Sequence, residues 1–291
     1  MRIGASGILV SQNGELLLIQ RNDTRTFSYP GGTIDTGELP TDGVVREVRE
    51  ETGLIVLPVR LVGLNFREFP PHSYLNFTFR CLLRGGEVTP SPESPHVGFY
   101  PTNNLPKPMA SFSRKRIENA LKHVGGPVVM DFQEAEWDTR IGNFLLQKII
   151  YPYFNWRRAR RGESAYIEPT SWQVSAYVII KNEAGGILLC QGNNLSLPGG
   201  LVKDNVPPWE TAVSLTKTQT NLDIQIENLA SVYITKEKPQ MSLIFTASAS
   251  PTQGNWGKPD ELPENVAPDH RTFIKNSFLP GEETSFYYFP Q

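Results

Sequence analysis

The sequence predicts an α/β protein that contains two similarly built domains. The chain has 291 residues, which is long for one compact domain and comfortable for two. It also repeats itself, because the Tyr-Pro-Gly-Gly sequence of residues 29–32 returns 168 residues later as Leu-Pro-Gly-Gly at 197–200. Within each copy, short apolar runs typical of strands alternate with helical patterns. These observations favour layered α/β domains.

Other landmarks of the two copies recur in the same order. They are residues 14–18 and 185–189, residues 104–106 and 261–263, and residues 113–117 and 270–274. Four landmarks in one order are hard to obtain by chance, so we interpret them as the duplication of one fold. We therefore expect a first domain over residues 1–124, a connector over 125–171 and a second domain over 172–291.

Local signals predict the elements of the first copy. Asn13-Gly14 between residues 8–10 and 16–19 is a strong hairpin signal, so these two runs are predicted to pair as strands. A helix is expected over residues 41–52, closed by Gly53 in a left-handed conformation. Further strands are predicted at 61–66, 74–83 and 97–100, and a last helix at 113–121.

The predicted connector contains a helical pattern over residues 134–153, followed by the basic run from Trp156 to Arg161. One interpretation of this run is a patch that binds anionic lipid or nucleic acid. The other is a connector helix packed on one domain with a solvated basic end. We favour the second, because a few arginines in a slightly acidic chain are a weak signal for binding.

Composition and charge restrict the functional class. The net charge is −2, whereas nucleic-acid-binding proteins normally carry a basic excess, so no nucleic-acid partner is expected. Cys81 and Cys190 lie in apolar runs and are interpreted as small buried hydrophobic residues rather than disulfide or zinc ligands. No apolar run reaches membrane-spanning length, and residues 1–10 lack the apolar core of a signal peptide. We therefore expect a reducing, cytoplasmic setting without membrane attachment.

Acidic residues follow the first Pro-Gly-Gly turn at a defined spacing. Gly32 is followed after five residues by Glu38, and the acidic pattern continues with Glu47, Glu50 and Glu51. On a helix the last three stand at i, i+3 and i+4, so their carboxylates share one face and repel each other. A multivalent cation that neutralises them explains such a cluster, and these oxygen ligands suit Mg²⁺ or Mn²⁺. The alternative, a solvated acidic face, does not account for the spacing from the turn.

With Arg46, Gly53 and Leu54 included, this segment resembles the catalytic segment of Nudix hydrolases. It matches every defined position of the Nudix box, G-x5-E-x7-R-E-U-x-E-E-x-G-U, where U is a bulky aliphatic residue. Nine specified positions within 23 residues make the match a specific signal. The resemblance implies a metal-dependent enzyme that cleaves a pyrophosphate linkage.

The resemblance also implies the metal ligands. Glu47, Glu50 and Glu51 would hold Mg²⁺, with Mn²⁺ as a possible substitute, helped by the backbone carbonyl of Gly31. Bound metal would bridge pyrophosphate oxygens and lower the pKa of an attacking water.

Four further residues of the segment are expected to act around the metal. Arg46, which we include among the catalytic residues, would pair with Glu38 and brace the loop against the helix. Gly32 would let the backbone approach the metal closely. Gly53 would end the helix.

Residues outside the segment are also candidates. The proton of the attacking water is taken either by a glutamate of the box or, as in ADP-ribose pyrophosphatase-like members, by a carboxylate on a later loop, for which Glu93 is the best candidate. The alternative for Glu93 is a surface acid. Arg21 ends the second strand, where family members often place an arginine near a phosphate. Phe27 would stack on a base, or else pack in the core.

The second copy lacks the acidic residues. At the same offset, Glu38, Arg46, Glu47, Glu50, Glu51 and Gly53 become Val206, Ser214, Leu215, Thr218, Gln219 and Asn221. Hydrolysis by this mechanism is therefore not expected there. One possible role is packing against the first copy in place of the second subunit of a Nudix homodimer. The other is a pocket that binds a nucleotide without cutting it. We favour packing, because Arg21 and Phe27 are also replaced, by Gly192 and Leu195.

The predicted fold is therefore two Nudix-type α/β/α sandwich domains with mixed sheets, joined by a helical connector and forming an intramolecular pseudo-dimer. The predicted reaction is Mg²⁺-dependent cleavage of a nucleoside diphosphate linked to another group, such as ADP-ribose, because residues 105–121 resemble that branch. The alternatives are a nucleoside triphosphate pyrophosphohydrolase and a non-catalytic nucleotide sensor. The intact carboxylates of the first copy argue against a pure sensor, because a sensor does not need to keep all three.

Overall fold

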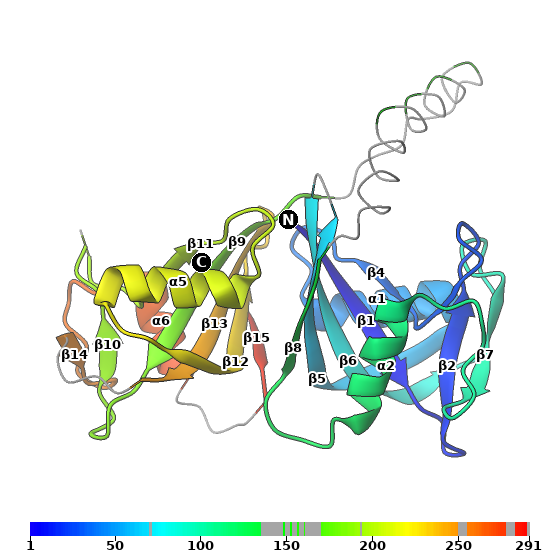
Figure 1. Ribbon diagram of the computed structural model, residues 1–291, viewed down its shortest axis with the longest axis horizontal. Coiled ribbons are helices and arrows are strands. Elements are labelled where there is room, and N and C mark those ends of the chain that lie inside the picture. Colours follow the sequence, from blue (N-terminus) through cyan, green and yellow to red (C-terminus); the bar gives the residue numbers. More distant parts are fainter. Residues whose placement is uncertain are drawn as a thin grey trace.

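A computed structural model describes most of the chain. The described residues are 1–69, 72–134, 170–192, 194–249, 255–277 and 283–289, with the isolated positions 148, 152, 156 and 160. The predicted connector helix and the basic run after it lie outside the described residues, apart from single positions. In Figure 1 the two halves of the chain lie side by side, with β8 (Val129–Gln133) and β15 (Ser285–Tyr288) between them.

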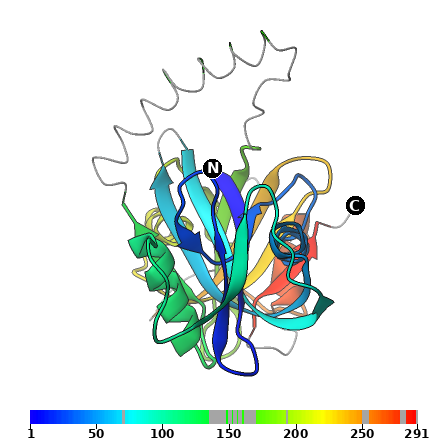
Figure 2. The same cartoon turned by 90° about the vertical axis from the view of Figure 1, so that its right-hand side faces the viewer.

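The first half is built on a mixed five-stranded sheet. Its strands are β1 (Arg2–Leu9), β4 (Gly31–Thr33), β5 (Leu54–Phe69), β6 (His72–Gly86) and β8, in the order β4-β1-β6-β5-β8. β1 pairs in parallel with β6 and antiparallel with β4. Helix α1 (Pro40–Thr52) packs on one face of the sheet and α2 (Ser111–Lys122) on the other, as Figure 2 shows. The predicted α/β/α arrangement is confirmed for this half.

A second, smaller sheet in this half corrects one prediction. β2 (Glu15–Gln20) pairs with β3 (Phe27–Ser28) and β7 (His96–Pro101), and not with β1. Only the bridge between Val10 and Leu16 joins the two predicted hairpin strands. The prediction of a strand pair was wrong because both edges of β1 are already taken by β4 and β6. The Asn13-Gly14 turn therefore passes the chain from one sheet to the other.

The second half repeats this topology. Its sheet has the order β11-β9-β13-β12-β15, which matches β4-β1-β6-β5-β8 strand for strand. The bounds are β9 (Gln173–Ile180), β10 (Ile187–Leu189), β11 (Gly199–Leu201), α5 (Pro208–Thr220), β12 (Gln225–Ile234), β13 (Gln240–Ser248), β14 (Asn255–Gly257) and α6 (Pro268–Asn276). The β10–β14 pair takes the place of β2–β7. The duplication inferred from the landmarks is thus present in the topology.

The two long helices begin and end in the same way. Each has proline near its start, where the missing N–H costs no hydrogen bond. Helix α1 ends at Gly53, which has φ 75° and donates its N–H to the Arg49 carbonyl at 2.8 Å. Helix α5 ends at Asn221, which has φ 58°. Asparagine tolerates the left-handed region better than most residues, so the helix end survived the loss of glycine. The predicted helix and its glycine end are confirmed.

Strand β8 lies inside the region predicted as a connector. It pairs in parallel with β5, from Gly63 opposite Val129 to Arg67 opposite Gln133. The first sheet therefore extends past residue 124, where the sequence suggested a boundary. Its counterpart β15 closes the second sheet against β12 in the same parallel sense.

One hydrophobic core joins the two halves. The ring of Phe286, in β15, lies 6.0 Å from Phe77 and 5.5 Å from Phe79, both in β6. Trp209, in α5, contacts Phe66 of β5 edge to face at 6.5 Å between ring centroids. Because these rings are shared, burial in one half depends on the presence of the other.

The cysteines are both free thiols. Cys81 is buried as expected, and burial raises its pKa to about 12. Cys190 is only partly buried, which differs from the expectation, because it lies at the end of a short strand rather than within the sheet. Among the described helices, none has the length and apolar character needed to cross a membrane.

Candidate active site

The predicted site residues come from the loop after β4 and from one face of α1. Glu38 and Arg46 form the pair that the sequence suggested. Arg46 donates from Nε to Oε1 and from Nη2 to Oε2 of Glu38, both at 2.8 Å. Nη2 also donates to the Thr33 carbonyl at 2.9 Å, so Arg46 ties the loop to the helix and to β4. This planar fork is the geometry that only arginine supplies.

The same guanidinium reaches two further carboxylates. Nη1 of Arg46 donates to Glu47 at 3.0 Å and to Glu50 at 3.3 Å. Burial raises the pKa of Glu38, but hydrogen bonds from Arg46 and from the Asp35 backbone outweigh it and hold the pKa below its usual value. For Glu47, burial outweighs the arginine and the pKa is raised. One cation therefore does not compensate the whole acidic cluster.

Glu51 is the most buried carboxyl of the helix, with 8% of the residue exposed. Its Oε2 accepts the backbone N–H of Gly31 at 2.8 Å. Burial raises its pKa to about 7, and the Gly31 hydrogen bond only partly offsets this, while the charge of Glu47 adds to it. A buried carboxyl held at such a cost beside other carboxylates is typical of a functional group.

Glycine is required where β4 meets the helix. A Cβ on Gly32 would lie 2.4 Å from Oε2 of Glu47. On Gly31, which has φ 151°, it would lie 2.5 Å from the Ala5 carbonyl oxygen. A side chain on Gly32 would therefore displace Glu47, and one on Gly31 would push β4 off β1. These contacts place the Gly31 and Gly32 backbone directly over the carboxylates.

Hard oxygen donors and an uncompensated negative charge fit a divalent cation at this place. No group of three or more metal-ligating side chains stands at binding spacing in the described part of the chain. The reason is geometric: Arg46 engages Glu47 and Glu50, while Glu51 turns to Gly31. The three carboxylates would have to leave these partners to come together.

The structure places the remaining candidates as follows. Glu93 lies on a loop whose backbone carbonyl accepts the Asn22 N–H at 2.8 Å, and its charge acts on both Glu51 and Arg21. Arg21 pairs with Asp23 at the surface, at 2.6 Å. Phe27 packs edge to face on Tyr100 at 5.4 Å, in keeping with the packing alternative.

Tyr74 was missed by the sequence analysis. It is partly buried, and its hydroxyl donates to the Gly32 carbonyl at 3.4 Å. Gly4 on the neighbouring strand makes room for the ring, since a Cβ there would lie 1.8 Å from the hydroxyl oxygen. A tyrosine at the start of an alternating strand carries no signal that could have pointed to this contact.

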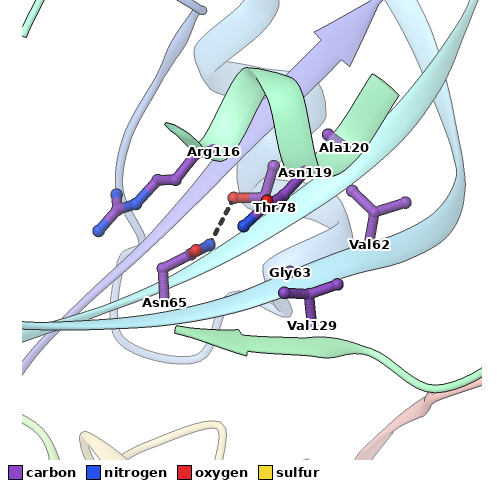
Figure 3. A pocket seen from close by; sticks show the side chains of 8 residues that line it. All are labelled: Val62, Gly63, Asn65, Thr78, Arg116, Asn119, Ala120 and Val129. Atoms are coloured by element: carbon purple, nitrogen blue, oxygen red, sulfur yellow. Dashed lines mark hydrogen bonds between the residues drawn. The ribbon is translucent and has the colours of Figure 1, made fainter. Parts of the chain in front are cut away.

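A small cavity lies between α2 and the sheet (Figure 3). It has a volume of about 10 Å³ and is lined by polar groups such as Asn65, Thr78 and Arg116. Asn65 donates to Thr78 at 2.9 Å across it. A space of this volume suits about one water molecule. It is therefore too small to receive part of a nucleotide.

The corresponding place in the second half is closed by uncharged groups. Gln219 stands where Glu51 stands in the first half and accepts the Gly199 N–H at 2.8 Å. Its amide nitrogen also donates to the Gly199 carbonyl at 2.9 Å, so both backbone groups of that glycine are satisfied. Leu215 replaces Glu47, and its Cδ1 would lie 3.3 Å from a Cβ on Gly200. This arrangement needs no cation.

We expect Glu51→Gln to stabilise the metal-free protein at high pH, because Gln219 shows that glutamine fits this environment. The pKa of Glu51 is higher in the folded chain than its ordinary value of 4.5. Its contribution to stability is therefore fully present below about pH 4.5 and is lost as the pH rises through about 7. The variant should be more stable than wild type at pH 8 by at most about 3 kcal/mol, with no gain near pH 4.5.

Urea unfolding in the presence of EDTA measures this difference. Glu50→Gln is the control, since the Glu50 side chain is 62% exposed. Stability curves of wild type and Glu51→Gln that stay parallel from pH 4.5 to 8 would show that Glu51 is not desolvated.

Comparisons with known proteins agree with the geometry of the first half. The NUDIX domain family matches residues 1–120. A MutT-like protein from Streptomyces ambofaciens is 33% identical over 123 residues, which are 42% of this chain and 79% of the relative. An ADP-ribose pyrophosphatase from Methanocaldococcus jannaschii is 32% identical over 128 residues, which are 43% of this chain and 75% of the relative. A crystal structure of an ADP-ribose pyrophosphatase from Streptococcus suis is 26% identical, covers 45% of this chain and 98% of its own, and has a TM-score of 0.38.

In the first half, the acidic helix α1 is held by the Glu38–Arg46 pair and lies against the two glycines of β4. Together with a mixed sheet between two helices, this arrangement defines a hydrolase of the Nudix type. The chain belongs to the Nudix family, and as an enzyme it is a Nudix pyrophosphohydrolase.

Proposed function

We propose that the first half cleaves the pyrophosphate of a nucleoside diphosphate linked to another group, in a reaction that depends on Mg²⁺. The observation that carries the proposal is the placement of Glu47, Glu50 and Glu51 on α1, beside the Gly31-Gly32 backbone, with more negative charge than Arg46 neutralises. The similarity to an ADP-ribose pyrophosphatase supports this substrate class.

In this proposal the three glutamates and the Gly31 carbonyl hold the metal. When bound, Mg²⁺ neutralises pyrophosphate oxygens and lowers the pKa of the attacking water. Glu47 and Glu50 would rotate away from Nη1 of Arg46 to hold the metal, while the two bonds of Arg46 to Glu38 keep the loop in place. Tyr74 fixes the Gly32 carbonyl, and so the path of the backbone over the carboxylates.

Two groups are suited to accept the proton of the water. Glu51 is one of them, because it lies against the Gly31 backbone, where the metal would be held. Glu93 stands on a separate loop near enough to influence Glu51, and it is exposed. Arg21, which lies beside Glu93, is proposed to contact a substrate phosphate once Asp23 releases it.

We further propose that the second half is a Nudix-like domain without catalysis, and that it replaces the second subunit of a dimer. The shared strand order and the rings that span the two halves support this. Gln219 and Leu215 fill the place where metal ligands would stand, so nothing there would hold a phosphate through a cation.

Nucleoside triphosphates are the second candidate substrate class. The 33% identity to a MutT-like protein and a similarity to a putative 8-oxo-dGTP diphosphatase from Bacillus subtilis favour it. The products separate the two candidates: a conjugate such as ADP-ribose gives two monophosphates, whereas a triphosphate gives a monophosphate and pyrophosphate.

A hydrolysis screen with Mg²⁺ tests the proposal. It compares wild type, Glu50→Gln and Glu51→Gln on ADP-ribose, other nucleoside diphosphate conjugates and nucleoside triphosphates. We expect wild type to cut at least one conjugate faster than any triphosphate, and both variants to lose this activity. If no compound is cut by wild type and spared by the variants, the result contradicts the proposed reaction and favours the nucleotide sensor.

A further inference from the structure

The second half of the chain touches the catalytic loop of the first. The turn between β12 and β13, residues 235–239, lies against Gly37, which precedes Glu38 in the loop. A Cβ on Gly37 would lie 2.4 Å from the Lys236 carbonyl oxygen, so the two backbones are in direct contact. Gly37 has φ 80°, a conformation that glycine adopts without strain.

A tyrosine of β15 reinforces this contact. The hydroxyl of Tyr288 donates to the Gly37 carbonyl at 3.2 Å. The ammonium of Lys236 lies 5.0 Å from the centre of the Tyr288 ring. The ring therefore links the turn of the second half to the loop of the first.

The contact lies one residue from the brace of the active site. Both carboxylate oxygens of Glu38 accept hydrogen bonds from Arg46, and Arg46 in turn reaches Glu47 and Glu50. A shift of Gly37 would move Glu38, and the arginine fork would lose its aligned partner. Outer contacts of this kind commonly tune metal affinity.

The equivalent loop of the second half can be compared with the loop that carries Gly37. Ser73, near the start of β6, makes a contact in the opposite direction, where its Oγ accepts the Asn205 N–H at 3.0 Å. Asn205, with φ 60°, stands where Gly37 stands in the first half. The next residue there is Val206, so this loop carries no brace. Each contact joins a hydroxyl of one half to the backbone of the other, but only one of them bears on a catalytic loop.

We propose that Tyr288 and the 235–239 turn are positioning residues of the active site, which hold the loop so that Glu38 keeps Arg46 in place. This inference rests on the proposed function. The second half thereby contributes to the reaction without touching substrate. This role does not need the carboxylates that the second half has lost.

Tyr288→Phe and Ser73→Ala form a matched pair, because each removes one hydroxyl that joins the halves. Two measurements apply to both variants: the Mg²⁺ concentration for half-maximal hydrolysis, and amide hydrogen exchange over residues 35–39 without metal. We expect Tyr288→Phe to raise the Mg²⁺ midpoint by about 10-fold and to speed exchange in the loop. Ser73→Ala should change neither.

Equal shifts of the Mg²⁺ midpoint in both variants, or exchange that does not change in Tyr288→Phe, would overturn the proposal. A purely structural role would lower the stability of both variants alike and leave the midpoints equal. If wild type cuts no substrate, the proposed function fails, whereas the exchange of residues 35–39 still decides whether Tyr288 positions the loop.

Discussion

Glu50→Gln is expected to lower kcat by roughly 10²- to 10⁴-fold, the range seen when a group acting at the reacting atoms is lost. The reason is that Glu50 is one of three proposed metal ligands. Its side chain is 62% exposed and makes one long hydrogen bond, 3.3 Å to Arg46, so the fold gains little from it. The free energy of unfolding without metal should therefore change by less than about 0.5 kcal/mol.

Steady-state hydrolysis and urea unfolding on the same preparation make this measurement. Glu118→Gln, an exposed acid on α2, serves as the control and should retain full activity. A Glu50→Gln protein that keeps more than about a tenth of the wild-type kcat would remove Glu50 from the metal site, since such a loss is below the range for a catalytic group.

Phe286→Ala is expected to destabilise both halves together, by about 2–4 kcal/mol, because it removes a partly buried ring that contacts Phe77 and Phe79 across the shared core. In a chain whose halves share one core, unfolding should remain a single transition. The hydrolytic activity of the first half should then be lost at the same temperature as the overall structure.

Phe273→Ala distinguishes shared from independent folding. Phe273 is 1% exposed and lies in the core of the second half, in contact with Tyr233 at 4.5 Å. If the halves are coupled, this variant also lowers the temperature at which activity is lost. Two separate calorimetric transitions, with activity following only one of them, would contradict the shared core.

The sequence predicted the catalytic helix best, because its signals are local. The Gly53 end and the i, i+3 and i+4 spacing of the carboxylates depend only on helix geometry, and α1 agrees with both. The Glu38–Arg46 pair was also expected, from the resemblance to the family, and the structure contains it.

Non-local pairing was not predictable in the same way. The Asn13-Gly14 turn is a correct turn signal, yet the strands on either side join different sheets, because the partners of β1 are far away in sequence. Strand β8 was missed because a five-residue edge strand has little pattern of its own. Tyr74 and Tyr288 act through contacts between distant segments, which one sequence does not reveal.

The two halves also show which features the fold itself requires. Gly199 and Gly200 keep the close backbone approach, while Glu51 and Glu47 have become Gln219 and Leu215. The second sheet forms with the same strand order without them. The carboxylates of the first half are therefore dispensable for folding, which is the expected pattern for residues kept for a reaction.

The most direct test of the account is the number of Mn²⁺ ions bound per chain, measured by electron paramagnetic resonance. Wild type is compared with the triple variant Glu47→Gln, Glu50→Gln, Glu51→Gln. Mn²⁺ suits the same oxygen ligands as Mg²⁺ and is spectroscopically visible. We expect wild type to bind Mn²⁺ and the folded triple variant to bind none, since Gln219 and Leu215 stand in the second half where Glu51 and Glu47 stand in the first. Equal binding by the two proteins would contradict a single metal site on the first half.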